Sequence, residues 1–256
     1  MKKLLSCLLA VLLLIPQITF ADSSPIGLQK TYDEEYLTED AWYDAAGNLV
    51  AGPYGYARVT YEYKSLSRPG NPTLIRYYDA EGNPYQFPEG YYGEKRSYSK
   101  GNQVLQQYVD DHNRPVNTTF GYASWEQTYT SDGQPRRLRY LNANGNITNV
   151  ESLGYASCIW TYSAKELQKI TYYNARGKET NTAAGYSRFV RKFDKKRRVL
   201  SEGYYRKDGT LVPGDEGWSL MEYTYDQETG ELLSAIRLDE NQNPWVTPTP
   251  TPTPTP

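Results

Sequence analysis

Residues 140–162, YLNANGNITNVESLGYASCIWTY, contain one copy of each of three sequence marks that recur along the chain. An Asn-x-x-Gly motif ends at Gly145, a Gly–aromatic pair stands at Gly154–Tyr155, and Tyr162 follows that glycine by eight residues. All three marks recur along the chain in steps of 31 to 35 residues, allowing for degenerate copies. A fixed period of this length predicts tandem repeats, each burying its apolar face against its neighbours.

Each repeat is predicted to be a β-hairpin. The strand that follows Gly154 alternates between two faces, and its more apolar face carries Ala156, Cys158, Trp160 and Tyr162. A period of two with one apolar face is typical of a half-buried strand. A short turn rich in Gly, Asn and Asp comes next. The second strand then runs to the Asp/Asn-x-x-Gly turn, and a link leads to the next hairpin.

The expected architecture is therefore all-β: a tandem array of about six β-hairpin repeats, superhelical or ring-like, with a leading half repeat. The six repeats occupy residues 55–246, and an N-terminal segment with the half repeat occupies residues 22–54. Residues 247–256 repeat Thr-Pro, a composition typical of an extended linker or tail. The sequence leaves open whether the array closes on itself and whether another domain follows the tail.

Residues 1–21 are predicted to be a secretory signal peptide. Lys2 and Lys3 precede a largely apolar run, Pro16 interrupts it, and Ala21 is a small residue suited to cleavage. The run is too short to span a bilayer. We therefore expect a secreted protein, extracellular or associated with the cell wall, without membrane insertion after signal cleavage.

The composition narrows the class of partner. Removal of Lys2 and Lys3 takes the formal net charge from −2 to −4, and a mildly acidic chain does not favour nucleic acid. Cys158 is then the single cysteine, so no internal disulfide forms, and we expect it to be a small buried residue. The chain has 26 tyrosines and 5 phenylalanines. Because a tyrosine ring is apolar but its hydroxyl can reach water, this predicts several thin, partly solvated cores rather than one thick apolar core.

Short motifs resemble two families of bacterial surface repeats. YYDAEGNPY (77–85), YLNANGNIT (140–148) and YYNARGKET (172–180) resemble both, and the first family is the cell-wall-binding repeats of the choline- and glucan-binding type. YDAAGNL (43–49) resembles the tyrosine-aspartate (YD) repeats of Rhs-like proteins. The resemblance covers residues 36–246. It implies a string of β-hairpins and, for the first family, a role in binding the cell wall.

No residue pattern predicts catalysis, a metal or a cofactor. His112 is the only histidine and lies in the turn of a degenerate repeat, without a predicted catalytic partner. Acids such as Asp44, Asp79 and Asp110 recur at turns, where an Asp side chain normally bonds its own backbone. Each turn supplies only one or two acids, too few to surround a calcium ion. We therefore expect the chain not to be an enzyme.

Two rows of aromatic residues are the candidates for function. One row ends the second strands, and its expected role is packing between hairpins: Trp42, Tyr77, Tyr108, Tyr140, Tyr172 and Tyr204. The other opens the first strands on the face that we expect to be exposed: Tyr56, Tyr91, Tyr122, Tyr155, Tyr186 and Trp218. Exposed aromatic rings in a row can stack on sugar rings, so the second row is the predicted ligand-binding set, although it could instead pack a link or a neighbouring hairpin.

The predicted function is a non-catalytic module, secreted or on the cell surface, that binds a glycan or cell-wall polymer. The alternative is a structural spacer or an adhesin-like domain whose partner is a surface protein. Ligand-sized grooves between hairpins would favour the first function, and a flat surface would favour the second.

Overall fold

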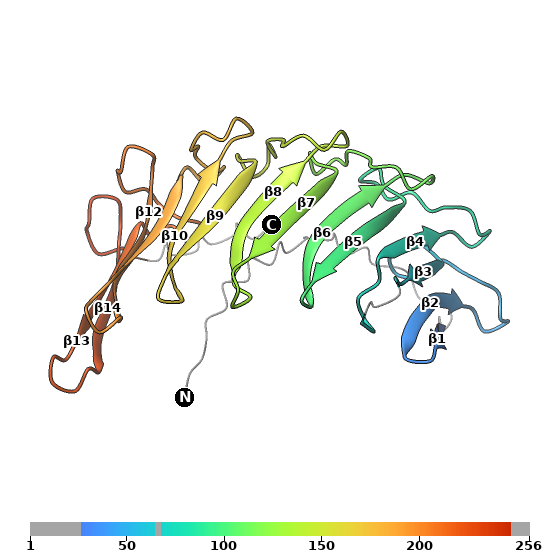
Figure 1. Ribbon diagram of the computed structural model, residues 1–256, viewed down its shortest axis with the longest axis horizontal. Coiled ribbons are helices and arrows are strands. Elements are labelled where there is room, and N and C mark those ends of the chain that lie inside the picture. Colours follow the sequence, from blue (N-terminus) through green and yellow to red (C-terminus); the bar gives the residue numbers. More distant parts are fainter. Residues whose placement is uncertain (1–26, 65–67, 247–256) are drawn as a thin grey trace, which may run out of the picture.

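The computed structural model describes residues 27–64 and 68–246. These residues form one antiparallel sheet of 14 strands whose spatial order follows the chain, and the sheet bends into an arch (Figure 1). The strands are β1 (Gly27–Asp33), β2 (Tyr36–Tyr43), β3 (Arg58–Glu62), β4 (Leu74–Tyr78), β5 (Gly93–Ser99), β6 (Asn102–Val109), β7 (Ser124–Tyr129), β8 (Pro135–Leu141), β9 (Ser157–Ser163), β10 (Glu166–Tyr173), β11 (Arg188–Phe193), β12 (Val199–Tyr205), β13 (Leu220–Tyr225) and β14 (Leu232–Leu238). The all-β array of hairpins is confirmed, and its two end strands do not pair with each other. The signal peptide and the Thr-Pro tail lie outside the described residues.

The leading element is a whole hairpin rather than the expected half repeat. β1 pairs with β2 from Gly27 opposite Tyr43 to Asp33 opposite Tyr36, which brings the array to seven hairpins. The sequence marks missed β1 because Leu28, and not an aromatic residue, follows Gly27, and because all of its side chains are exposed. In this exposed edge strand Lys30 separates the two apolar side chains, Leu28 and Tyr32, so the strand gives no alternating pattern to find.

Neighbouring hairpins are joined by short stretches of pairing. Between β8 and β9, for example, only Arg137, Leu138 and Arg139 pair with the facing strand. The other five junctions between hairpins also contain three residue pairs each. Within a hairpin the pairing is longer, with seven pairs between β9 and β10. Each hairpin is therefore a unit that relies on side chains as well as backbone bonds to hold its neighbour.

The turns follow the expected chemistry. Asn142 Oδ1 accepts hydrogen bonds of 3.0 Å from the backbone N–H groups of Asn144 and Asn146. The degenerate turn that begins at Arg206 is closed instead by Asp208, whose Oδ1 accepts from the N–H of Thr210 at 2.9 Å. The interpretation of the recurrent turn residues as backbone acceptors is confirmed.

Both aromatic rows lie on one face of the sheet and form a single ladder, which we call the aromatic spine. Consecutive ring centroids are 4.5 to 6.1 Å apart, a range typical of favourable aromatic pairs. At about 0.5–1.5 kcal/mol per pair, the spine contributes several kcal/mol to the array beyond the area that it buries. Its members are Trp42, Tyr56, Tyr77, Phe87, Tyr91, Tyr108, Tyr122, Tyr140, Tyr155, Tyr172, Tyr186, Tyr204 and Trp218.

The spine corrects the expectation that the second row faces away from the apolar side. Tyr155 precedes β9, and the positive φ of Gly154 (79°) turns the chain just before it. The alternation of the strand therefore does not extend back to Tyr155, whose ring instead packs 4.8 Å from Tyr172. Cys158 is buried in the same core, as predicted.

The link between hairpins packs against the spine from outside. In the link of the fourth hairpin, the N–H of Thr148 donates to the carbonyl of Tyr140, and the N–H of Val150 donates to the carbonyl of Tyr155, both at 3.0 Å. Val150 is 1% exposed and belongs to the core of the spine. The link comes closest to the spine at Gly214, where the β-carbon of any other residue would collide with the ring of Tyr204. The link thus closes one edge of each repeat.

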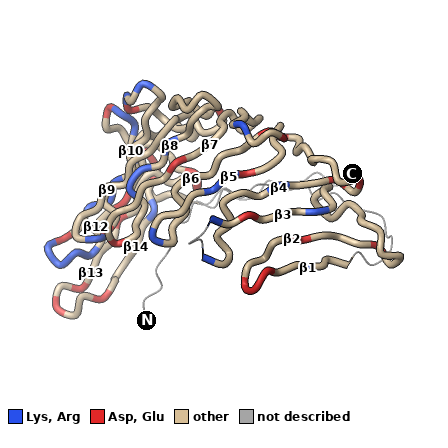
Figure 2. Tube along the Cα trace, turned by 45° about the vertical axis from the view of Figure 1, so that its right-hand side comes forward, with Lys and Arg blue, Asp and Glu red and all other residues tan. Residues whose placement is uncertain are grey.

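Charged residues on the spine face of the N-terminal repeats are paired. The carboxylate of Glu94, 6% exposed, accepts hydrogen bonds from Arg96 at 2.7 and 3.1 Å and from the hydroxyl of Tyr77 at 3.2 Å. Such a buried carboxylate is tolerated because its hydrogen-bonding capacity is satisfied. Elsewhere, residues of both charge signs are interspersed along the array (Figure 2). The described residues contain no helix that could cross a bilayer.

A second set of tyrosines joins a hairpin to the one before it at four junctions, and we call them stapling tyrosines. Their hydroxyls donate to backbone carbonyls of the preceding hairpin at 2.6 to 3.1 Å. The four bonds run from Tyr63 to Leu37, Tyr129 to Gln103, Tyr162 to Pro135 and Tyr225 to Val199. At these four positions the third sequence mark, eight residues after the Gly–aromatic glycine, is therefore a contact between repeats.

The buried tyrosines of the spine make the folded protein less stable at alkaline pH. Burial raises the pKa of Tyr56 and Tyr186 to about 12, and it raises the pKa of Tyr155 and Tyr172 further. Tyrosines of the unfolded chain ionise near pH ~10, so above that pH the unfolded state binds fewer protons than the folded state. The stability from these groups is complete below pH ~10 and is lost as the pH rises. We expect cooperative unfolding above pH ~10.

Tyrosinate absorbance and near-ultraviolet circular dichroism, followed together, check this dependence. The two signals are expected to change in one step, since the spine tyrosines ionise as the fold opens. A titration near pH ~10 of all 26 tyrosines with unchanged dichroism would contradict a buried spine.

Candidate ligand-binding hollow

The candidate site is a hollow of about 450 Å³ on the spine face of β6, β7 and β8. This volume lies in the range of about 300–1,000 Å³ that small-molecule sites occupy. Aromatic, amide and hydroxyl groups share its lining, among them Gln106, Phe120, Tyr122, Trp125, Gln127 and Ser152. We call it the aromatic hollow.

Strand pairing brings the lining residues together. Gln106 on β6 lies opposite Trp125 on β7, and Gln127 on β7 lies opposite Leu138 on β8. Residues directly opposite in an antiparallel pair have side chains on the same face. Trp125 and Gln127, two positions apart on one strand, therefore both face the hollow.

The floor of the hollow belongs to the spine. Tyr108 and Tyr140 are 8% and 6% exposed, whereas Tyr122 and Trp125 are half-buried and line it. Burial raises the pKa of Tyr122, so its hydroxyl stays protonated at neutral pH. The hollow thus offers apolar ring surface beside the amides of Gln106 and Gln127. This combination suits a ligand with apolar faces and a rim of hydroxyl groups.

The predicted ligand-binding row is placed differently from the expectation. Tyr155, Tyr186 and Trp218 are 5%, 6% and 6% exposed, so the expected exposure is wrong for them. Tyr56 and Tyr91 are half-buried within the spine. Tyr122 is the member of the row that lines the aromatic hollow. A role of this row in ligand contact remains a prediction.

Sequence reasoning missed Trp125, Gln106 and Gln127. The alternation of Ala123, Trp125, Gln127 and Tyr129 places all four on the apolar face of their strand. The sequence did contain a sign of a polar site on this face, because Gln127 interrupts the run of apolar residues. The neighbouring Gln106 interrupts the facing strand of the preceding hairpin in the same way.

A second hollow, of about 700 Å³, lies at the tips of the β5–β6 and β7–β8 hairpins. Leu105, Glu126 and Thr128 line it from the face opposite the spine. Tyr129 is its one aromatic lining residue, and that hydroxyl is already engaged by the carbonyl of Gln103. It is larger but lacks an aromatic platform, so the aromatic hollow is the better candidate.

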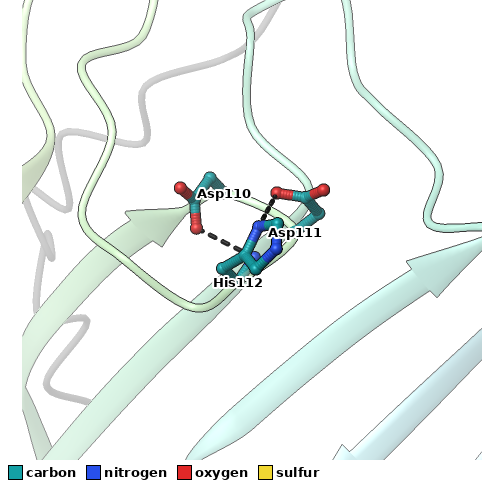
Figure 3. A group of neighbouring side chains, drawn as sticks. All are labelled: Asp110, Asp111 and His112. Atoms are coloured by element: carbon teal, nitrogen blue, oxygen red, sulfur yellow. Dashed lines mark hydrogen bonds and ion pairs between the residues drawn. The ribbon is translucent and has the colours of Figure 1, made fainter.

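One group of potential metal ligands occurs among the described residues, at Asp110, Asp111 and His112 in the turn after β6 (Figure 3). Asp110 accepts from the N–H groups of His112 and Arg114 and from the Arg114 guanidinium at 2.8 to 2.9 Å. Asp111 contacts His112 Nδ1 at 2.7 Å. These bonds close the turn in the manner of the other repeats, and nothing further points to a bound ion.

Comparisons with known proteins add little to this description. No family model and no curated protein matches the chain. Two solved structures with some likeness are the crystal structures of TcdB2-TccC3-Cdc42 (TM-score 0.23) and TcdB2-TccC3 (TM-score 0.21), each 12% identical. Each likeness covers 86% of this chain and 13% of the other chain. Superpositions this poor carry no argument about function.

Proposed function

We propose that the chain is a non-catalytic repeat module, secreted or on the cell surface, that binds a glycan or cell-wall polymer. The observation that carries the proposal is the aromatic hollow, in which Trp125 and Tyr122 lie beside the amides of Gln106 and Gln127. Sugar rings present apolar C–H faces and a rim of hydroxyl groups, so they need both kinds of surface. The leader-like sequence of residues 1–21 supports an extracellular location.

The arrangement of potential catalytic groups supports a non-catalytic role. His112 lies in an exposed turn and bonds to Asp111 next to it. The turn carboxylates, such as Asp79 and Asp239, accept hydrogen bonds from their own turns, which lower the pKa of both groups. Such carboxylates stay ionised at neutral pH and are poor general acids.

The test is co-sedimentation of the mature protein with purified bacterial cell wall and with insoluble polysaccharides. We expect saturable binding that Trp125→Ala weakens at least about tenfold, which corresponds to about 1.4 kcal/mol. Gln127→Ala is a second variant that removes an amide and leaves the ring in place. We expect it to weaken binding in the same direction.

Trp160→Ala is the matched control. Trp160 is a half-buried tryptophan on the spine face of β9, in the next repeat, and it does not line the aromatic hollow. We expect it to leave binding unchanged in the folded fraction. Absence of sedimentation with every polymer, or equal loss in Trp125→Ala and Trp160→Ala, would overturn the proposal and favour a spacer or a protein-binding array.

A further inference from the structure

The junction between hairpins has one design that repeats along the array. Three residue pairs join the strands, and at four junctions a stapling tyrosine also bonds the carbonyl that lies five positions before the spine residue of the preceding strand. Pro135 stands in that relation to Tyr140, and Val199 to Tyr204. Any strand pair that reproduces these two features reproduces the junction.

β1 carries the second half of this junction. Tyr32 pairs with Leu37 just after a register shift, as Tyr129 pairs with Pro135, so Tyr32 occupies the position of a stapling tyrosine. It is 54% exposed, and Leu28 on the same strand is 46% exposed. No described hairpin precedes β1, and no described residue accepts a hydrogen bond from the Tyr32 hydroxyl.

β14 carries the first half. Arg237 occupies the position of a spine residue, two places before the turn that begins at Asp239. Five positions earlier, Leu232 pairs with Tyr225 and presents its carbonyl where Val199 presents the acceptor on β12. Leu232 is 55% exposed.

Exposed apolar side chains gather on these two strands. Of the eight large hydrophobic side chains that are exposed among the described residues, five lie on β1 or β14: Leu28, Tyr32, Leu232, Leu233 and Ile236. Long, unpaired apolar edges are a recognised template for pairing with another chain. The internal junctions show what such pairing looks like in this protein.

We propose that copies of the chain join head to tail, with β14 of one copy pairing with β1 of the next in the register of the internal junctions. That register sets Ile236 opposite Gly27, Ala235 opposite Leu28 and Ser234 opposite Gln29 of the next copy. The hydroxyl of Tyr32 then donates to the carbonyl of Leu232. A second copy fits both ends of the array, because the chain already builds the three-pair junction six times and adds the tyrosine bond at four of those junctions. Such a heterologous contact generates a filament or a ring.

Two variants, each with one added cysteine, test the contact. Leu28→Cys and Ala235→Cys proteins, purified separately and mixed under oxidising conditions without polysaccharide, are expected to form a covalent pair. The matched control replaces Ala235→Cys with Leu200→Cys, an exposed leucine (42%) on the interior strand β12, and no such pair is expected. The native Cys158 is buried and does not compete.

Light scattering on the mature protein gives the second readout. We expect the mass to rise with concentration to two or more chains, and Leu28→Lys to return it to one chain while Leu200→Lys leaves it unchanged. A mass of one chain at every concentration, with no cross-link above the control, overturns the proposal. This outcome is independent of glycan binding, since no polymer is present.

Discussion

Replacing Tyr155 with alanine is expected to lower the free energy of unfolding by about 3–5 kcal/mol, the cost typical of truncating a buried aromatic side chain. Tyr155 is 5% exposed, and its ring lies 6.1 Å from that of Tyr140 and 4.8 Å from that of Tyr172. It therefore joins the spine ring of the fourth hairpin, β7–β8, to that of the fifth, β9–β10. Its removal leaves a cavity that the short three-pair junction with β8 does not close.

Chemical denaturation followed by circular dichroism measures this loss. Tyr54→Ala is the matched control, because Tyr54 is 56% exposed and touches the spine only at its edge, through Tyr56. We expect the control to lose less than about 1 kcal/mol. Equal losses in the two variants would show that the spine is not the core of the array.

The second large effect is expected for Gly154→Ala. Gly154 has a φ of 79°, and a β-carbon there would lie 2.6 Å from the backbone nitrogen of Ala183 and 2.7 Å from the carbonyl carbon of Thr182. The left-handed conformation costs an alanine about 1–2 kcal/mol. Overlap with the backbone of the next link adds about 1–3 kcal/mol. We therefore expect a loss of about 2–5 kcal/mol.

Gly145→Ala separates the two contributions. Gly145 has nearly the same φ, 78°, but nothing lies within 4 Å of the position of its β-carbon. This variant is expected to lose only the conformational part, about 1–2 kcal/mol. The melting temperatures of the two variants, compared in one buffer, check the difference. A Gly145→Ala protein as unstable as Gly154→Ala would contradict the close contact between links.

The fold was predictable because its turns require particular residues. Gly145 and Asn142 mark a turn by backbone conformation and by side-chain bonding, and both requirements are local to a few residues. β1 was missed because it is an exposed edge strand without alternation. Tyr155 was placed on the wrong face because one turn residue, Gly154, breaks the period of two before the strand begins.

The candidate site was less predictable because it forms between repeats. Gln106 lies opposite Trp125 because of the register between β6 and β7, and these two strands belong to different hairpins. The sequence marks fix the period but not this register. Burial is also a property of neighbours, and it separates Tyr122, which lines the hollow, from its equivalent Tyr155, which is covered.

The spine holds the array together, and we propose that the adjacent aromatic hollow binds the ligand. One experiment tests both halves: unfolding free energy and cell-wall binding measured side by side for Tyr155→Ala and Trp125→Ala. We predict that Tyr155→Ala loses more unfolding free energy than Trp125→Ala, yet its folded fraction still binds. Trp125→Ala stays folded and loses binding. Full binding by Trp125→Ala, or loss of binding without loss of stability in Tyr155→Ala, would contradict this division of roles between spine and hollow.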